Sequence, residues 1–361
     1  MKLYIIAGEA SGDLHGSNLV KALKSKDETT QIKAWGGDKM ETAGAELVKH
    51  YRDLAFMGFI EVIKNLPTIL RNISFCKTDI KAFDPDAIIL IDYPGFNLRI
   101  ADWAKENNYK VIYYISPQIW AWNTGRVHKI KALVDKMICI LPFEKAFYAE
   151  HGMDVSYVGH PLIEAVQEIK SKAPEVSDRP TLLLLPGSRK QEIQIMLPIM
   201  LDAAKRLKKY RIIIAGLSAI GRDYYQSLST DSNIELIMDR PYECMRQSTK
   251  AWVSSGTATL EAALFDLPQI VCYKGNKWSY LIAKRLVKVE YISLVNLIAG
   301  NEIIRELIQD ELTVENLLKE TKLLELNSKS IIEQYHNEVI THLGDGNTSK
   351  NTAELIRSSL L

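Results

Sequence analysis

The strongest constraint on the fold is the segment 181–192, Thr-Leu-Leu-Leu-Leu-Pro-Gly-Ser-Arg-Lys-Gln-Glu. Four consecutive leucines are too few to span a membrane and suit a β-strand that is buried on both faces. Strands of this kind occur in parallel sheets that helices cover on both sides. The turn Pro186-Gly187-Ser188 ends the strand, and a helical segment follows. The segment therefore predicts an α/β fold.

The same turn is a candidate phosphate site. A tight turn between a strand and a helix directs free backbone N–H groups toward one point, which favours an anion there. Arg189 and Lys190 follow the turn, and a guanidinium can bind phosphate oxygens through two hydrogen bonds. The alternative is an ordinary surface turn with two solvated cations, and the segment alone does not separate the two interpretations.

Strand-like and helix-like runs alternate along the chain, which predicts parallel sheets built from βα units. Residues 3–7 form the first strand, a Gly-rich polar turn follows, and residues 17–24 have a helical pattern. The glycines of this turn recur every fourth residue, so they match neither the dinucleotide fingerprint nor the P-loop. Glu9, Ser11 and Asp13 crowd into the turn, and we expect them at the carboxyl edge of the sheet, where such folds bind ligands.

Asp92 is the candidate catalytic residue. It directly follows the apolar strand 87–91, and a carboxylate at this position lies at the ligand-binding edge of a parallel sheet. The alternative is that Asp92 only caps the following turn. A third strand, 111–115, leads to Trp120 and Trp122, for which packing is the favoured interpretation over ligand contact. The basic residues from 126 to 131 are typical of a solvated helix face.

The length of the chain, 361 residues, predicts two domains. Residues 169–179 are rich in Lys, Ser, Asp, Glu and Pro without an apolar period, which is a linker composition. We therefore expect one domain over 1–168, a second over 180–340 and a tail over 341–361. Within the second domain, residues 302–340 have the pattern of consecutive helices.

The second domain contains another polar entry to a helix. A short strand, 251–253, precedes Ser255-Gly256-Thr257, and Glu261 follows about one turn into the helix. A carboxylate there could accept hydrogen bonds from two ribose hydroxyls, or it could only complement the helix dipole. Together with the basic turn at 187–189, this acidic turn supplies the combination that a nucleoside diphosphate needs.

Composition and charge exclude several classes of protein. A formal charge of +1 gives no electrostatic reason to expect a nucleic-acid partner. The N-terminal apolar run is too short for a signal peptide, and no stretch has the length of a transmembrane helix. The four scattered cysteines indicate reduced core residues of a cytoplasmic protein. Asp84-Pro85-Asp86 precedes a strand, so we interpret it as a turn and expect neither a metal nor another cofactor.

Several longer motifs occur in a fixed order along the chain. They are Ala-Gly-Glu-Ala-Ser-Gly-Asp at 7–13, Ser-Pro-Gln-Ile-Trp-Ala-Trp at 116–122, Leu-Pro-Phe-Glu-Lys at 141–145, Leu-Pro-Gly-Ser-Arg at 185–189, Ser-Gly-Thr-Ala-Thr-Leu-Glu at 255–261, Ala-Lys-Arg-Leu-Val-Lys at 283–288, Asn-Leu-Ile-Ala-Gly at 296–300 and Glu-Leu-Ile-Gln at 306–309. Together they resemble the lipid-A-disaccharide synthase family, glycosyltransferase family 19. Val295 is a departure, because the family usually has proline there.

The resemblance implies a GT-B architecture, with two Rossmann-like, doubly wound parallel-sheet domains facing a central cleft. It implies UDP-2,3-diacylglucosamine as donor, 2,3-diacylglucosamine 1-phosphate as acceptor, and a β-1,6-linked disaccharide 1-phosphate and UDP as products. Inversion at the donor sugar implies a single displacement with one general base, for which Asp92 is the match. The implied substrate-binding residues include Gly187, Ser188, Arg189, Glu192 and Gly256. By the same match, Thr257 and Glu261 hold the ribose and diphosphate. Asn296, Glu302 and Gln309 face the cleft from the second domain, and Glu9, Ser11 and Asp13 shape the acceptor side.

Substrates with acyl chains imply contact with a membrane surface. The segment from Phe56 to Leu70 repeats apolar residues at helical spacing, with Lys64 and Arg71 nearby. Its pattern alone favours a helix packed on the first sheet, but the implied substrates favour a peripheral contact with the cytoplasmic face of the inner membrane. The sequence leaves a homodimer open. It also leaves open another GT-B transferase, a UDP-sugar 2-epimerase and a nucleotide-binding module without catalysis.

Overall fold

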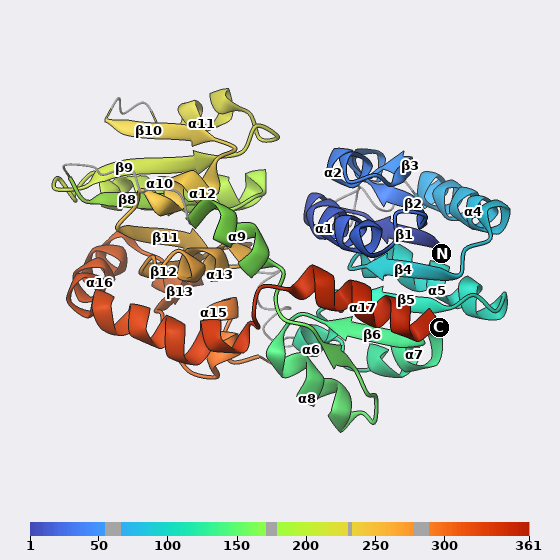
Figure 1. Ribbon diagram of the computed structural model, residues 1–361. Coiled ribbons are helices and arrows are strands. Elements are labelled where there is room, and N and C mark those ends of the chain that lie inside the picture. The colour runs from blue at the N-terminus through green and yellow to red at the C-terminus, as the bar shows by residue number, and fades with distance from the viewer. Residues whose placement is uncertain (55–65, 171–178, 230–232, 277–288, 361) are drawn as a thin grey trace. The chain divides into compact units, whose positions relative to one another are not determined.

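The computed structural model describes residues 1–54, 66–170, 179–229, 233–276 and 289–360. The chain divides into two compact units (Figure 1): unit 1 comprises Met1–Pro161 and Gly344–Leu361, and unit 2 comprises Leu162–Leu343. This division differs from the boundaries that we expect from sequence. Helix α9 (Leu162–Lys170) belongs to unit 2, where the Lys170 ammonium donates to the Leu264 carbonyl (2.9 Å) and pairs with Asp266 (2.6 Å).

Unit 1 is a seven-stranded parallel sheet with the strand order β3-β2-β1-β4-β5-β6-β7. Its strands are β1 (Lys2–Ala7), β2 (Gln31–Gly36), β3 (Glu46–His50), β4 (Ala87–Ile91), β5 (Val111–Tyr114), β6 (Lys136–Cys139) and β7 (Ser156–Tyr157). Its helices are α1 (Ala10–Lys26), α2 (Asp38–Thr42), η1 (Tyr51–Asp53), α4 (Leu66–Phe83), α5 (Pro94–Glu106), α6 (Ile119–Trp122), α7 (Arg126–Leu133), α8 (Pro142–Glu150) and α17 (Thr348–Leu360). Strand β4 is buried along its whole length, as its apolar run predicts.

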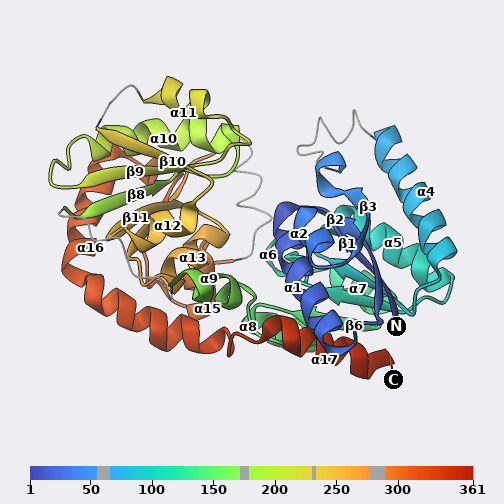
Figure 2. The same ribbon diagram turned by 45° about the horizontal axis from the view of Figure 1, so that its top comes forward.

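The last helix, α17, returns to unit 1 after the chain has passed through unit 2. It packs beside α1, as both ribbon views show (Figures 1 and 2). Lys26 of α1 pairs with Glu354 of α17 at 2.8 Å, and the Lys110 ammonium donates to the Ser359 carbonyl. The residues that we expect to form a separate tail are therefore part of the first unit.

Helix α1 begins immediately after Glu9, earlier than the pattern at 17–24 predicts. The glycines that suggest a loop are packing positions instead. A Cβ on Gly12 would lie 3.0 Å from the Ala7 Cβ, and one on Gly16 would lie 2.7 Å from the Met40 sulfur. Ser11 and Asp13 consequently lie on the first turn of a helix, where Ser11 is exposed and Asp13 is buried.

Unit 2 is a six-stranded parallel sheet with the order β10-β9-β8-β11-β12-β13. Its strands are β8 (Thr181–Leu185), β9 (Arg211–Gly216), β10 (Ile234–Met238), β11 (Lys250–Ser254), β12 (Gln269–Tyr273) and β13 (Glu306–Ile308). Its other helices are α10 (Lys190–Ala204), α11 (Arg222–Leu228), α12 (Pro241–Arg246), α13 (Thr257–Leu264), α15 (Leu294–Ala299), η2 (Gln309–Glu311), α16 (Val314–Gln334), the π-helix η3 (Tyr335–Val339) and η4 (Ile340–His342). Strand β8 is buried throughout, as the leucine run predicts, whereas β13 lies where the sequence predicts helix.

Both sheets reverse their direction of winding at their centre. In unit 1 the strand order runs outward from β1 on one side and from β4 on the other, and β8 and β11 take the same places in unit 2. Doubly wound sheets bind ligands at the carboxyl ends of the two central strands, in the crevice that such a reversal of winding creates. The predicted fold class, two Rossmann-like doubly wound sheets, is confirmed. No helix in the described ranges combines the length and the apolarity needed to cross a bilayer.

Candidate functional site

The turns after β1 and β4 bring Glu9, Ser11 and Asp92 to the crevice of unit 1. Strands β1 and β4 pair in register, with Ala7 opposite Ile91, so the residues that follow them meet at one edge. Glu9 and Ser11 are exposed there, and Asp92 is half-buried. Tyr93 packs over this turn, and a Cβ on Gly8 would lie 2.3 Å from the Tyr93 ring. Position 8, directly after β1, therefore accepts only glycine.

Two side chains hold Asp92 through its backbone carbonyl. Its φ of 44° is in the left-handed region, and the Tyr93 φ of 46° continues this unusual turn. The Tyr113 hydroxyl and the Asn97 amide both donate to the Asp92 carbonyl, at 2.6 and 2.7 Å. Neither Tyr113 nor Asn97 stands out in the sequence, because hydrogen bonds to a backbone carbonyl leave no motif.

The electrostatic environment of Asp92 suits a base. Burial, and after it the negative charge of Glu9, raise the pKa of the Asp92 carboxyl to about 6, although a hydrogen bond from the Tyr93 backbone opposes them. A carboxylate with a pKa close to neutral is ionised at pH 7 and still has affinity for a proton. These are the properties that general-base catalysis requires.

Asp13 contributes to the scaffold of this edge. Its Oδ1 accepts from the backbone N–H groups of Gly37 (2.8 Å) and Met40 (3.1 Å), and its Oδ2 accepts from that of Lys39 (3.2 Å). The buried carboxylate thus binds the start of α2, the helix after the neighbouring strand β2. Asp13 therefore stabilises the turn after β1 from its buried side, whereas Glu9 and Ser11 are exposed to solvent.

In unit 2 the basic turn after β8 is closed by an internal ion pair. Gly187 has a φ of +119°, and Ser188 leads to Arg189 at the N-cap of α10. The Glu192 carboxylate accepts from the Ser188 N–H (3.2 Å) and from the Arg189 guanidinium (3.1 Å). Arg189 remains 67% exposed. Glu192 therefore binds the turn itself, and Arg189 is the group that remains accessible to an anion.

The acidic turn follows β11, the other central strand of unit 2. Gly256 has a φ of +139° and precedes Thr257, the first residue of α13. Glu261 lies one turn further on, where its Oε1 accepts from the Tyr242 hydroxyl at 2.8 Å. Burial raises the pKa of the Glu261 carboxyl, and the Tyr242 hydrogen bond opposes that shift. Tyr242, which the sequence analysis does not identify, fixes the orientation of this carboxylate. The turns at 187–189 and 256–261 therefore follow two adjacent parallel strands and lie at the same edge of the sheet of unit 2.

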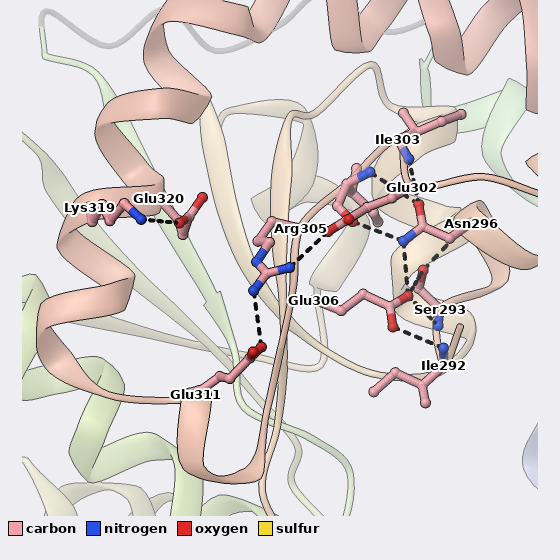
Figure 3. A network of polar contacts seen from close by, with 11 residues as sticks. Ile292, Ser293, Asn296, Glu302, Ile303, Arg305, Glu306, Glu311, Lys319 and Glu320 are labelled. Carbon is pink, nitrogen blue, oxygen red and sulfur yellow. Dashed lines mark hydrogen bonds and ion pairs between the residues drawn. The ribbon is translucent and has the colours of Figure 1, made fainter. Parts of the chain in front are cut away.

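Asn296 has a different environment from the one that we expect. It is fully buried, and its Oδ1 accepts from the backbone N–H groups of Ile303 (2.9 Å) and Ile304 (3.0 Å) (Figure 3). Its Nδ2 donates to the Ile304 carbonyl (2.8 Å) and to the Glu306 carboxylate (3.0 Å). The amide binds the chain rather than facing solvent.

Glu306 completes this network, a role that its place in the motif at 306–309 does not reveal. Its carboxylate accepts from the Ile292 N–H (2.9 Å), the Ser293 N–H (3.0 Å) and the Ser293 hydroxyl (2.7 Å) (Figure 3). The network closes the loop between α15 and β13, which brings the rest of the 296–309 motif into position.

The two remaining predicted residues differ in exposure. Glu302 is exposed and pairs with Arg305 at 3.2 Å (Figure 3). Gln309 is buried with a φ of 54°, and its amide exchanges two hydrogen bonds with the backbone of Gly275, at 3.2 and 3.3 Å. Gln309 thus joins the carboxyl end of β13 to the chain that leaves β12.

Among the described residues, neither the cysteines nor the other metal-ligand residue types form a centre. All four cysteines are buried and none forms a disulfide, as the sequence predicts. In the part of the chain that the structure describes, His, Cys, Asp and Glu side chains nowhere gather in a group of three that could hold a metal ion.

Comparison with known proteins identifies close relatives over the whole length. The model of the family described as lipid-A-disaccharide synthetase matches residues 3–359. The lipid-A-disaccharide synthase of Syntrophus aciditrophicus is 41% identical over 329 residues, covering 88% of this chain and 86% of the relative. That of Trichlorobacter lovleyi is 38% identical over 375 residues, covering 99% and 97%.

Solved structures of lower identity share the architecture. The Neisseria meningitidis UDP-GlcNAc 2-epimerase bound to UDP-GlcNAc has a TM-score of 0.70 at 14% identity, covering 99% of this chain and all of the other. The S. aureus MnaA–UDP co-structure has a TM-score of 0.71 at 15% identity, with 99% and 96% covered. Acinetobacter baumannii MurG has a TM-score of 0.58 at 12% identity, with 99% of each chain covered. At these identities the likeness shows the fold alone.

The family match and the relatives confirm the resemblance carried by the sequence motifs. The two doubly wound sheets agree with it, since these solved structures share that architecture. The chain belongs to the lipid-A-disaccharide synthase family, glycosyltransferases of the GT-B fold that act in lipid A biosynthesis.

Proposed function

We propose that this chain is an inverting glycosyltransferase. It transfers the sugar of UDP-2,3-diacylglucosamine to the 6-hydroxyl of 2,3-diacylglucosamine 1-phosphate, with release of UDP. The observation that carries the proposal is the Asp92 carboxylate at the crevice of unit 1, with its pKa raised to about 6 beside Glu9. Inversion needs one group that removes the acceptor proton, and this carboxylate has a suitable position and basicity.

The reaction is a single displacement. Asp92 accepts the proton of the acceptor 6-hydroxyl while that oxygen forms a bond to C1 of the donor sugar from the β face. The bond from C1 to the UDP oxygen breaks on the opposite face. The departing diphosphate gains negative charge, which the turn at 187–189 and the exposed Arg189 are suited to stabilise. Glu261, oriented by Tyr242, and Thr257 are suited to hold the nucleoside and diphosphate.

Product analysis tests the proposal directly. Purified protein is incubated with the two diacylated substrates, and the lipids are resolved by mass spectrometry. A tetraacyl disaccharide 1-phosphate with a β linkage supports the proposal. An epimerised UDP-sugar, a different acceptor requirement, or binding without turnover would each contradict it and would point to the other classes that share this fold.

The pKa of Asp92 predicts an acid limb in the pH profile. Asp92 must be ionised to accept a proton, so kcat/KM should fall tenfold per pH unit below about pH 6. Glu9→Gln removes the like charge that raises this pKa, and the limb should move to lower pH. Initial rates between pH 4.5 and 8, with folding monitored in parallel, measure both. A flat profile down to pH 5 would exclude Asp92 as the titrating base.

Arg189→Ala should weaken UDP binding by about 1.5–3 kcal/mol, the usual scale of hydrogen bonds to charged groups. Isothermal titration with UDP measures the change. Arg222→Ala is a control, because it removes a cation from the first position of α11, after the neighbouring strand β9. If Arg189→Ala binds UDP as tightly as the wild type, the phosphate site lies elsewhere.

We also propose that the enzyme acts at the cytoplasmic face of the inner membrane. The segment from Phe56 to Leu70 is the proposed contact, and its residues 56–65 lie outside the described residues. At its described end, α4 has Leu66 47% exposed and Leu70 56% exposed. These leucines are one helical turn apart, so they lie on the same face of α4.

Leu66→Ser combined with Leu70→Ser should weaken binding to anionic liposomes by about tenfold or more, because interfacial helices gain affinity from buried apolar area. The melting temperature should change little, since both side chains are exposed. Liposome flotation measures binding, and Leu326→Ser, at an 81% exposed leucine of unit 2, is the matched control. Unchanged flotation of the double variant would remove this part of α4 from the membrane contact.

A further inference from the structure

An exposed tryptophan and an arginine form a pair beyond the carboxyl end of β5. Trp122, the last residue of α6, is 49% exposed, and the Arg126 guanidinium lies 4.9 Å from the centre of its ring. Lys129, three residues further along α7, pairs with Asp102 at 3.2 Å. Within the described residues no ion pair engages Arg126. Trp120, by contrast, is buried and packs edge-on against Phe143 at 4.8 Å.

This pair belongs to the segment that follows β5, the strand beside β4. Strand β5 is the direct neighbour of β4, with Tyr114 opposite Ile91. The Asp92 N–H donates to the Tyr114 carbonyl (3.4 Å), and the Tyr113 hydroxyl donates to the Asp92 carbonyl (2.6 Å). The segment that leaves β5 therefore starts beside the proposed base and reaches Trp122 within a few residues.

The segment after β5 has a strained backbone and is held by a buried hydrogen bond. Ile115, directly after β5, has a φ of 65°, a conformation that β-branched residues rarely adopt. The next residue, Ser116, is buried and hydrogen-bonds the buried Tyr148 hydroxyl at 2.7 Å. Strain of this kind persists only where the surroundings impose it, and it concentrates at ligand-binding segments.

We propose that Trp122 and Arg126 form a binding subsite for a phosphorylated sugar, namely the acceptor of the proposed reaction. The part of the indole that Arg126 leaves uncovered packs on the pyranose ring, and the guanidinium binds the phosphate. Stacking of Arg126 on the ring holds the guanidinium in place, and its planar fork matches two phosphate oxygens. The inference rests on the proposed function for the identity of the acceptor.

Direct binding of a short-chain 2,3-diacylglucosamine 1-phosphate, and of the same compound without its phosphate, tests the subsite by isothermal titration. Arg126→Ala should weaken binding of the phosphorylated compound about 10- to 100-fold and leave the other unchanged. Trp122→Ala should weaken both about 3- to 10-fold, and Trp122→Phe should restore most of the loss. Lys129→Ala, a matched loss of charge on α7, should change neither.

The subsite is overturned if the wild type does not bind the phosphorylated compound, or if Arg126→Ala loses affinity for both compounds equally or for neither. Turnover separates this inference from the proposed function. If the wild type forms the disaccharide and Arg126→Ala has an unchanged KM for the acceptor, only the subsite is wrong. If binding shows the expected pattern but no disaccharide forms, the subsite stands and the proposed reaction is wrong.

Discussion

Replacing Asp92 by asparagine should lower turnover by about two to four orders of magnitude, the usual contribution of a general base. The substitution should leave the fold intact, because Tyr113 and Asn97 bind the backbone carbonyl of Asp92 and not its carboxylate. Asparagine also tolerates the left-handed backbone that this position requires. Single-turnover and steady-state rates of the purified variant, with UDP affinity measured in parallel, give the effect.

The other end of β4 supplies a control for this experiment. Asp84 also has a positive φ, of 50°, and it precedes the strand that Asp92 follows. Asp84→Asn makes the same chemical change far from the crevice, so its turnover should equal that of the wild type. Wild-type turnover in a folded Asp92→Asn variant would show that another group removes the proton.

Asn296→Ala should destabilise unit 2 by about 3–5 kcal/mol, because it leaves two buried N–H groups and their neighbouring acceptors without partners. For a unit of this size, that loss lowers the melting temperature by roughly 6–20 °C. Calorimetry measures the transition, and hydrogen exchange at the Ile303 and Ile304 amides reports whether the loop itself opens.

Asn301→Ala is the comparison for this variant. Asn301 belongs to the same loop but is exposed, where its amide donates to Glu338 at 2.8 Å, so its loss should cost little. A stable Asn296→Ala variant with weakened substrate binding would instead support the role that the sequence motif suggests, an amide that contacts the ligand.

Much of the fold can be predicted from the sequence because its central strands are apolar without interruption. The runs at 87–91 and 182–185 leave no plausible alternative to strands buried on both faces. The residues that follow these strands, Asp92 and Gly187–Arg189, are then placed at the carboxyl edge by topology alone. That is why these positions can be assigned before any coordinates are known.

Contacts between residues far apart in sequence account for what cannot be predicted. Nothing in the local pattern shows that Asp13 binds the start of α2, or that Glu306 accepts from Ser293. The same holds for Gly12. Its sequence context suggests a loop, whereas in the structure it is a helical residue that packs against Ala7. Polar residues in a binding motif can thus either contact a ligand or hold the loop that does, and only tertiary structure separates these roles.

The return of α17 to unit 1 has a consequence for synthesis on the ribosome. Unit 2 is continuous in sequence, so all of its residues are available before Thr348–Leu360 are made. Unit 1 begins first but lacks the helix that packs on α1 until translation has passed through the whole of unit 2. Domains usually fold as they emerge, N-terminal first. Here we expect the order of completion to be reversed, because α17 can cover its side of α1 only after all of unit 2 has been synthesised.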